Sequence, residues 1–456
     1  MSRPLVKRLV TLAVLFSLCS APLLFSNTKV QAVGHNSNTT VTDSKISPDL
    51  RHLILSGQGD KRVKVIVQQV QETTSGGLLG GLLNTVGGLL EGVLALLNVR
   101  ILDVRVNDVE VLATDPNVSY ISLDAPVRSS GHLTTTTGAQ QVRVQKTLLG
   151  TNNLDGSGVT IAVLDSGIDK NHKSFAATGK IKFNKDFTGE NRTDDPWGHG
   201  THVAAIAAGI GSPTAGAYEG IAPGANLVNL RVLDSQGVGK VSGVLTALEW
   251  VLANKNSYGI RVVNMSLGTL AVNSYKADPI CAAVRKLVNA GVVVVAAAGN
   301  MGKDDNGRRL YGAIHAPGNE PAAITVGASN SFGTDGRNDD GVTSYSSRGP
   351  TRSFSIDSYG LVHFDNIIKP DLVAPGNKII SASAANNNLL KLYPELETNK
   401  YSTSNMKLMY LSGTSMSTPA VAGAAAMLLE ANSSLTPNMI KMLLLYTAQP
   451  LSGFNT

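Results

Sequence analysis

The stretch Leu411-Ser412-Gly413-Thr414-Ser415-Met416-Ser417-Thr418-Pro419 leads from small residues through one serine into a long apolar segment. That segment, Pro419 to Leu429, has the alanine-rich composition of a buried helix. Ser415 is therefore expected at the start of a helix, with an exposed hydroxyl and an unpaired backbone N–H. One interpretation of such a serine is a simple helix N-cap. The other is a nucleophile, which needs a base and an orienting acid from elsewhere in the chain.

Length and composition predict a globular protein of more than one unit. The 456 residues fit one large domain plus a small one. Charged residues make up only 16% of the chain and glycines number 46, which is typical of a tightly turned globular protein rather than a disordered one. The net charge of +6 is scattered, with no run of basic residues. We therefore expect no nucleic-acid partner.

The N-terminus, residues 1–32, is typical of a signal peptide. Basic residues precede an apolar run from Leu9 to Phe25, and Val30-Gln31-Ala32 offers a small-residue cleavage site. A short membrane anchor is the alternative. We therefore expect a secreted, extracellular protein. Removal of the signal leaves Cys281 as the only cysteine, so the mature chain cannot form an internal disulfide.

Residues 45–130 are expected to fold as a small, separate α+β module of the ferredoxin-like type. Alternating apolar residues predict strands at 62–70, 99–106 and 118–124, and a capped helix is expected at 107–113. The stretch Gly76 to Leu97 has the length of a transmembrane helix. Asn84, Glu91 and several glycines within it argue against a stable membrane span. We expect it to be a loosely helical, partly covered insert.

A polar, threonine-rich linker that is open to proteolysis is predicted at 131–149. From residue 150 the sequence alternates apolar runs with helical patterns. The helical patterns span Thr201–Ala208, Val241–Asn254 and Pro279–Ala290, and the apolar runs lie at 159–164, 225–233, 260–267, 291–300 and 322–328.

These runs are as apolar as strands buried on both faces, so we predict an α/β three-layer sandwich with a mostly parallel sheet. Ligands of such sheets bind at the carboxyl ends of strands. Asp165, Ser266 and Asn300 fall at such ends.

The segment Gly198-His199-Gly200-Thr201-His202 places a histidine just before an apolar helix. The flanking glycines allow close backbone approach to its ring. A zinc pair of His199 and His202 is the alternative interpretation, but no glutamate or third ligand stands nearby in the sequence.

Three segments together resemble the active-site signatures of subtilisin-like serine proteases: Asp165–Asp169, His199–Ala204 and Gly413–Pro419. Their order, aspartate then histidine then serine, is the order of that family. The resemblance implies a subtilisin-like catalytic domain at 150–456. The unit at 45–130 resembles the family's propeptide, which acts as an intramolecular inhibitor and folding chaperone.

The resemblance also implies a role for each residue. Ser415 would attack the peptide carbonyl, His199 would act as the base, and Asp165 would orient the imidazole. Asn300 would donate to the oxyanion together with the Ser415 N–H. The implied protein is a secreted serine endopeptidase that acts on polypeptides through an acyl-enzyme and is made as a self-processed precursor.

The resemblance further implies a substrate cleft that binds an extended peptide through main-chain hydrogen bonds. The residues of its pocket walls are small and apolar, which favours substrates with large apolar side chains. The residues assigned to the cleft are Ser266, Leu267, Gly268, Ala297, Ala298, Gly299, Gly237 and Gly239.

Several points stay open at the level of sequence. The chemistry requires no cofactor, and Asp186, Asp194 and Asp195 are either structural calcium ligands or solvated loop charges, so no metal ligand is assigned. An insertion at 382–409 is interpreted as a rim loop. A final helix is expected to begin at Thr436 and Pro437, and we expect the chain to be truncated after it, since similar proteases continue past this helix.

Two other functions compete with this interpretation. One is a subtilisin-like scaffold that is inactive and kept for binding. The other is an acid-acting peptidase of the sedolisin type, which would carry a glutamate where His199 stands.

Overall fold

The computed structural model describes residues 45–55, 57, 59–70, 89–94, 98–124, 132–147, 150–211, 216–398 and 402–451. The predicted signal peptide lies outside them. The chain divides into two compact units, Met1–Val127 and Arg128–Thr456. Each unit is described by itself below.

The N-terminal unit contains a four-stranded antiparallel sheet of order β2-β3-β1-β4. Its strands are β1 (Arg62–Gln69), β2 (Leu89–Leu94), β3 (Val99–Arg105) and β4 (Val118–Leu123), and its helices are α2 (Pro48–Leu55) and α4 (Val109–Ala113). Val65 and Val67 are fully buried, as the alternating pattern of β1 predicts. The helix expected at 107–113 begins at Val109 instead, directly after a 3-10 turn at Val106–Asp108.

The stretch 76–97, expected to be a loosely helical and partly covered insert, forms a strand where the structure describes it. Residues Leu89–Leu94 form β2, which pairs with β3, and Leu89 and Val93 are more than half exposed. The prediction of a helix is therefore wrong for this part, because pairing with β3 satisfies the backbone. The remainder of the stretch at 76–97, apart from this strand, lies outside the described residues. Within the described part of the chain, no helix is long and apolar enough to cross a membrane.

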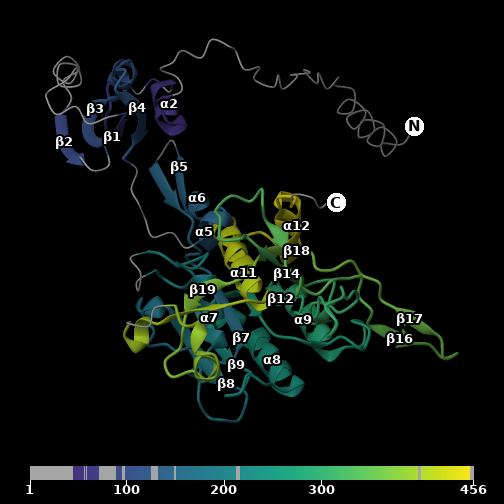
Figure 1. Cartoon of the computed structure of the whole chain (residues 1–456). Helices are drawn as coiled ribbons and strands as arrows, with labels where there is room; N and C mark the ends of the chain where they lie inside the picture. Colours follow the sequence, from purple (N-terminus) through teal and green to yellow (C-terminus); the bar gives the residue numbers. More distant parts are fainter. Residues whose placement is uncertain are drawn as a thin grey trace, which may run out of the picture. The chain divides into compact units, whose positions relative to one another are not determined.

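The large unit is built on an eight-stranded sheet of order β15-β14-β12-β10-β7-β9-β8, with β18 also paired to β14 (Figure 1). All pairings within it are parallel except that of β15 with β14. The strands are β7 (Thr160–Asp165), β8 (Ile181–Asp186), β9 (Asn226–Arg231), β10 (Ile260–Met265), β12 (Val293–Ala297), β14 (Ile324–Asn330), β15 (Gly341–Val342) and β18 (Leu372–Pro375).

Helices cover both faces of this sheet, which confirms the predicted three-layer α/β fold. Alternate residues of β7 divide between two cores: Ile161 and Val163 pack in one, and Ala162 and Leu164 in the other. The first core includes α7 (His199–Ala208) and α11 (Thr414–Ala431), and the second includes α8 (Val241–Tyr258) and α9 (Pro279–Asn289). Buried strands with apolar residues on both faces explain why the sequence runs are continuous rather than alternating.

Residues 132–147, which the sequence predicts as a polar linker, form short elements on the large unit. They are α5 (His132–Thr136), α6 (Ala139–Arg143) and β5 (Val144–Thr147). Leu133 packs against the first core, and Ala139 is buried in it. Arg143 also pairs with Glu219 and donates to the Gly220 and Ile221 carbonyls, so apolar and polar contacts together hold the segment.

The end of the described chain forms α12 (Pro437–Thr447). The Thr436 side chain accepts from the Met439 N–H, so the predicted start of this helix is confirmed. Lys441 on α12 donates to the carbonyls of Pro321 and Ala323, each at 2.8 Å, and thereby fixes the helix to the loop before β14.

Candidate active site

Asp165 and His199 meet at the carboxyl end of the central strand β7. Asp165 is its last residue and is 1% exposed. Its Oδ1 lies 2.7 Å from His199 Nδ1 and accepts the Ser166 N–H at 2.8 Å. A carboxylate on Nδ1 fixes that nitrogen as the protonated one, which leaves Nε2 as the basic nitrogen.

The glycines around His199 allow this close approach. Gly198 precedes α7 with φ of 102°, a left-handed conformation. A Cβ on Gly200 would lie 2.2 Å from the Gly167 carbonyl oxygen and 3.1 Å from the Asp165 Cβ, so only glycine fits. Burial by itself would lower the pKa of His199, but the charge and hydrogen bond of Asp165 outweigh it, and the pKa lies above its ordinary value.

Asp195 supports this pair, although the sequence suggested it only as a calcium ligand or a solvated charge. Its carboxylate is 2% exposed and accepts three hydrogen bonds, from Ser166 Oγ at 2.8 Å and from the Gly198 and Thr201 N–H groups at 2.7 Å. It thus binds the backbone on both sides of His199. An acid four residues ahead of a helix start is the signal that could have identified it.

Ser415 lies in the first turn of α11, as predicted. Its hydroxyl donates to the Ser266 carbonyl oxygen at 3.1 Å, and the Ser266 hydroxyl in turn donates to the Ser415 carbonyl oxygen at 2.8 Å. Within the described residues no hydrogen bond joins Ser415 to His199. Catalytic hydrogen bonds are often loose before substrate binds.

Asn300 lies beside the start of α11. Its Oδ1 accepts the Thr414 N–H at 2.9 Å and the Thr414 hydroxyl at 3.0 Å. These two donors fix the orientation of the amide. A Cβ on Gly413 would lie 3.3 Å from Asn300 Nδ2 and 3.7 Å from Oδ1, so both ends of the amide lie close to the turn that carries Ser415.

His202 does not form a metal pair with His199. Its Nε2 lies 3.0 Å from the Ile379 carbonyl and 3.2 Å from the Met409 carbonyl, while His199 uses Nδ1 for Asp165. Burial, with a smaller effect of His199, lowers the pKa of His202 to about 3. No group of three metal-ligating side chains occurs in the part of the chain that the structure covers.

The predicted pocket walls follow neighbouring strands, with Ser266–Gly268 after β10 and Ala297–Gly299 at the end of β12. The ring of His315 lies between them, a feature that the expectation of small apolar walls did not include. A Cβ on Gly268 would lie 3.0 Å from the His315 Cβ, and one on Gly299 would lie 2.8 Å from its Cγ. Burial lowers the pKa of this histidine.

The remaining residues predicted for the cleft, Gly237 and Gly239, lie in the turn after β9. Gly239 bridges Leu233, and a Cβ on Gly237 would lie 2.5 Å from Trp197 Nε1. This places the turn against the loop that precedes His199. The insertion at 382–409 contacts the same loop, because the Asn388 N–H donates to the Pro196 carbonyl and the Leu389 N–H to that of Trp197.

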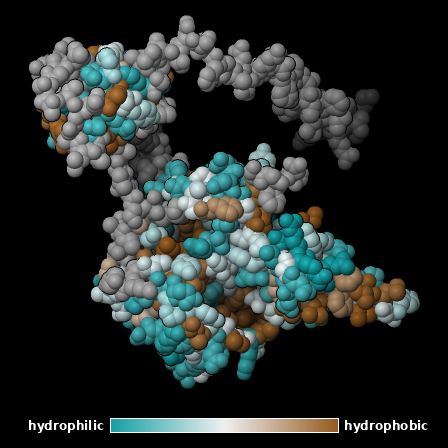
Figure 2. All heavy atoms as spheres, in the orientation of Figure 1, coloured by the Kyte–Doolittle hydropathy of each residue, from teal (hydrophilic) through white to brown (hydrophobic). Residues whose placement is uncertain are grey.

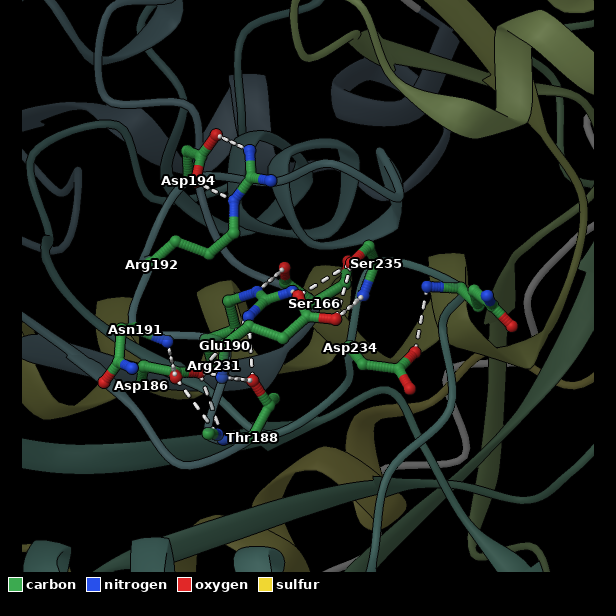
Figure 3. A network of polar contacts seen from close by, with 12 residues as sticks. Ser166, Asp186, Thr188, Glu190, Asn191, Arg192, Asp194, Arg231, Asp234 and Ser235 are labelled. Atoms are coloured by element: carbon green, nitrogen blue, oxygen red, sulfur yellow. Dashed lines mark hydrogen bonds and ion pairs between the residues drawn. The ribbon is translucent and has the colours of Figure 1, made fainter.

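Arg231 joins the segment after β7 to the loop that carries Asp186 and Asp194, two of the acids for which the sequence left calcium binding and solvation open (Figure 3). Its guanidinium is fully buried and donates to the Ser166 carbonyl at 3.0 Å, to Asp186 at 3.2 Å and to Thr188 at 2.8 Å, and it also pairs with Glu190. Glu190 accepts the Ser235 hydroxyl as well.

All three acids for which the sequence left calcium binding open accept hydrogen bonds from other groups of the protein. Asp186 accepts from Thr188 and Arg231, Asp194 pairs with Arg192 at 2.5 Å, and Asp195 accepts the backbone N–H groups near His199. Their carboxylates are therefore part of the hydrogen-bonding of the fold.

Comparison with known proteins gives one consistent family. Residues 156–456 match the sequence model of the Subtilase family, Peptidase_S8. The chain is 38% identical to the serine protease AprX of Bacillus subtilis over 299 residues, which cover 64% of this chain and 61% of AprX. It is 36% identical to the extracellular serine proteinase of a Thermus species over 76% of this chain and 70% of that protein.

A third relative extends over the N-terminal unit. Subtilisin E of Bacillus subtilis is 28% identical over 448 residues, which cover 98% of this chain and 94% of that protein. The likeness therefore includes the residues that precede the large unit.

Proposed function

The chain belongs to the subtilase family, and on this premise we propose that it is a secreted serine endopeptidase that hydrolyses polypeptides through Asp165, His199 and Ser415. The 2.7 Å contact between Asp165 Oδ1 and His199 Nδ1 at the end of β7 carries this proposal. The placement of Ser415 in the first turn of α11, beside the fixed amide of Asn300, supports it.

In the proposed reaction, the Ser415 hydroxyl turns about its Cα–Cβ bond from the Ser266 carbonyl toward His199. Nε2 of His199 takes the hydroxyl proton as Oγ forms a bond to the substrate carbonyl carbon. The carbonyl oxygen becomes an oxyanion, and the Asn300 amide and the Ser415 N–H donate to it. Asp165 stabilises the imidazolium through its hydrogen bond to Nδ1.

The tetrahedral intermediate then breaks its bond to nitrogen. His199 gives the proton to the leaving amine, and an acyl group remains as an ester on Ser415. A water molecule repeats the cycle: His199 removes a proton from the water as the water oxygen attacks the ester carbon. The bond between that carbon and Ser415 Oγ then breaks, and the serine oxygen takes the proton from His199. The products are a free amine and a free carboxylic acid, and every step uses protein groups and water alone.

The strand order indicates how the substrate lies. Strands β12, β10 and β7 are neighbours and carry Asn300, Ser266 and Asp165 at or just beyond their carboxyl ends. If the oxyanion points to Asn300 and the leaving amine to His199, the acyl chain leaves the reacting carbon along Ser266–Gly268. The residues N-terminal to the scissile bond would pair with that segment as an extended strand.

We further propose that the chain is a precursor, with a signal peptide at 1–32 and an inhibitory propeptide at 45–130. The sheet order of the N-terminal unit, in which β1 lies between β3 and β4, is compatible with a ferredoxin-like module. The alignment with subtilisin E, which runs through this region, also supports it. A Ser415→Ala precursor should then stay intact; processing of that variant without added protease would refute self-cleavage.

A fluorophosphonate probe tests the activity itself, because it labels only an activated serine. The purified protein should be labelled at Ser415, and the Ser415→Ala variant should not. Thr418→Ser, which alters another hydroxyl of α11, serves as the control and should be labelled normally. Absence of labelling in a processed, folded protein would favour the inactive scaffold instead.

A further inference from the structure

A hairpin that the proposed mechanism does not use projects from the large unit (Figure 1). Strands β16 (Phe354–Ile356) and β17 (Val362–Phe364) pair in antiparallel register. Side chains alternate between the faces of such a ribbon, so Ser355 and His363, which are paired, lie on one face. The opposite side, called the apolar face below, consists of Phe354, Ile356, Val362 and Phe364.

The apolar face is open to solvent. Ile356 is 62% exposed, Val362 49% and Phe364 42%, and Tyr359 and Leu361 in the connecting turn are more exposed than not. Figure 2 shows hydrophobic atoms over this projecting arm. Contiguous exposed apolar side chains on a soluble protein mark a binding surface.

The hairpin is nevertheless well ordered by polar contacts. In the turn, the Asp357 carboxylate accepts the N–H groups of Tyr359 and Leu361, both at 2.9 Å, and contacts His363 Nε2 at 2.8 Å. An isolated two-stranded ribbon is only marginally stable. These contacts therefore hold a shape that its own apolar packing would not maintain.

The base of the hairpin is bound to the neighbouring segment 272–275. The Phe354 N–H donates to the Val272 carbonyl at 3.0 Å, and the Ser274 N–H donates to the Phe354 carbonyl at 2.7 Å. Asp365 accepts the Ser274 hydroxyl at 2.6 Å and the Tyr275 N–H at 3.0 Å. The hairpin is thus an extension of segment 272–275.

That segment continues directly from the wall at Ser266–Gly268. Between the wall and the hairpin, Leu270 is 60% exposed and Val272 is 56% exposed. The Val272 N–H donates to the Leu270 carbonyl at 3.1 Å, so the chain turns between these two residues and keeps their side chains close together. Exposed apolar side chains therefore run from the proposed substrate wall to the hairpin.

The distance matches an extended substrate. Val272 lies six positions after Ser266, so at most about 20 Å of chain joins them. A substrate strand that pairs with the wall covers this length with a similar number of residues. The hairpin would then meet substrate residues roughly six to ten positions from the scissile bond.

We propose that the apolar face, with Leu270 and Val272, is a second substrate-binding surface that holds an apolar segment N-terminal to the scissile bond. This inference rests on the proposed function. Charged groups lie near the apolar face: Asp357 and His363 contact each other, and the Arg352 guanidinium lies 4.1 Å from the centre of the Phe364 ring at the base of the hairpin. The surface selects for apolar sequence in an unfolded or extended polypeptide.

The test compares two sets of quenched fluorescent peptides that share the same four residues before the cleaved bond. One set ends there, and the other is extended by ten residues at the N-terminus, either apolar or polar. The purified protein should cleave the apolar extension with a kcat/KM about tenfold above the polar one, chiefly through KM. In the variant Ile356→Ser with Val362→Ser this preference should vanish, while the short peptide is cleaved as before.

A matched control removes apolar surface elsewhere: Met442→Ser with Tyr446→Ser changes two exposed side chains of α12 and should retain the preference. The inference is overturned if the preference is absent from the unaltered protein or persists in the hairpin variant. It is also overturned if the variant instead dissolves a dimer on size exclusion, since the face would then bind a second copy. Failure to cleave even the short peptide would count against the proposed function.

Discussion

Arg231 should be the most sensitive single charge of the large unit. Its guanidinium is fully buried and donates to Ser166, Asp186 and Thr188 and pairs with Glu190. In Arg231→Met each of these acceptors loses one donor, although Asp186 keeps those of Thr188 and Asn191 and Glu190 keeps that of Ser235. Removing one partner of a buried ion pair costs about 3–5 kcal/mol.

The lower end of that range applies here. The Asp186 and Glu190 side chains are 10% and 34% exposed, so water can hydrate them after the arginine is gone. We expect the free energy of unfolding to fall by about 3 kcal/mol. The large unit, residues 128–456, has an unfolding entropy of about 0.7 kcal/mol/K, so the melting temperature should then fall by about 4 °C.

Urea unfolding at pH 7 measures this quantity, in a Ser415→Ala background that prevents self-digestion. Arg192→Met is the control, because Arg192 pairs with Asp194 in the same region but both side chains are about half exposed. The control should change the free energy of unfolding by no more than about 1 kcal/mol. Equal losses in the two variants would refute the argument that burial makes Arg231 special.

The pH dependence gives a second check. Burial alone would raise the pKa of Asp186, but hydrogen bonds from Thr188 and Asn191 and the charge of Arg231 bring it below its ordinary value. A depressed carboxyl pKa stabilises the fold above about pH 4 and loses that effect as the pH falls. Arg231→Met should therefore lose less stability on acidification than the parent protein; a steeper acid loss would contradict this sign.

Three further predictions concern catalysis. Asn300→Ala should lower kcat by about 10²–10³, a range known from subtilisin, with little change in KM, and an unchanged kcat would exclude Asn300 as an oxyanion donor. Because Asp165 raises the pKa of His199, kcat/KM should rise with pH through a midpoint above about 6.5, and a midpoint below that value would contradict the raised pKa. His315→Ala removes the ring between Gly268 and Gly299, so cleavage after phenylalanine should gain about tenfold in kcat/KM over cleavage after alanine; an unchanged ratio would place the ring outside the pocket.

Much of the large unit could be predicted from sequence because its signals are local. A run such as Val159–Leu164 is apolar at every position but Thr160, which is typical of a strand buried on both faces. The helix that begins near Ser415 follows from composition in the same way. The strand at Leu89–Leu94 is not predicted from sequence, because leucine and glycine without alternation indicate neither a strand nor a helix. Pairing with β3 decides the structure of this segment.

The residues around the site could not be predicted, because each acquires its role from a distant partner. Asp195 looks like any loop acid until Ser166 and the Gly198 N–H surround it. His315 looks like a turn residue until Gly268 and Gly299 lie on either side of it. No periodicity encodes such contacts.

Local patterns a few residues long are sufficient to predict the layered α/β fold, the family resemblance, and which chemical groups stand at strand ends and helix starts. Three other features follow only from the packed molecule: Asp165 lies 2.7 Å from His199, Arg231 is buried among acids, and the apolar hairpin continues the segment after Ser266. Those distances depend on how strands and helices far apart in the chain pack together, and packing is a property of the whole fold.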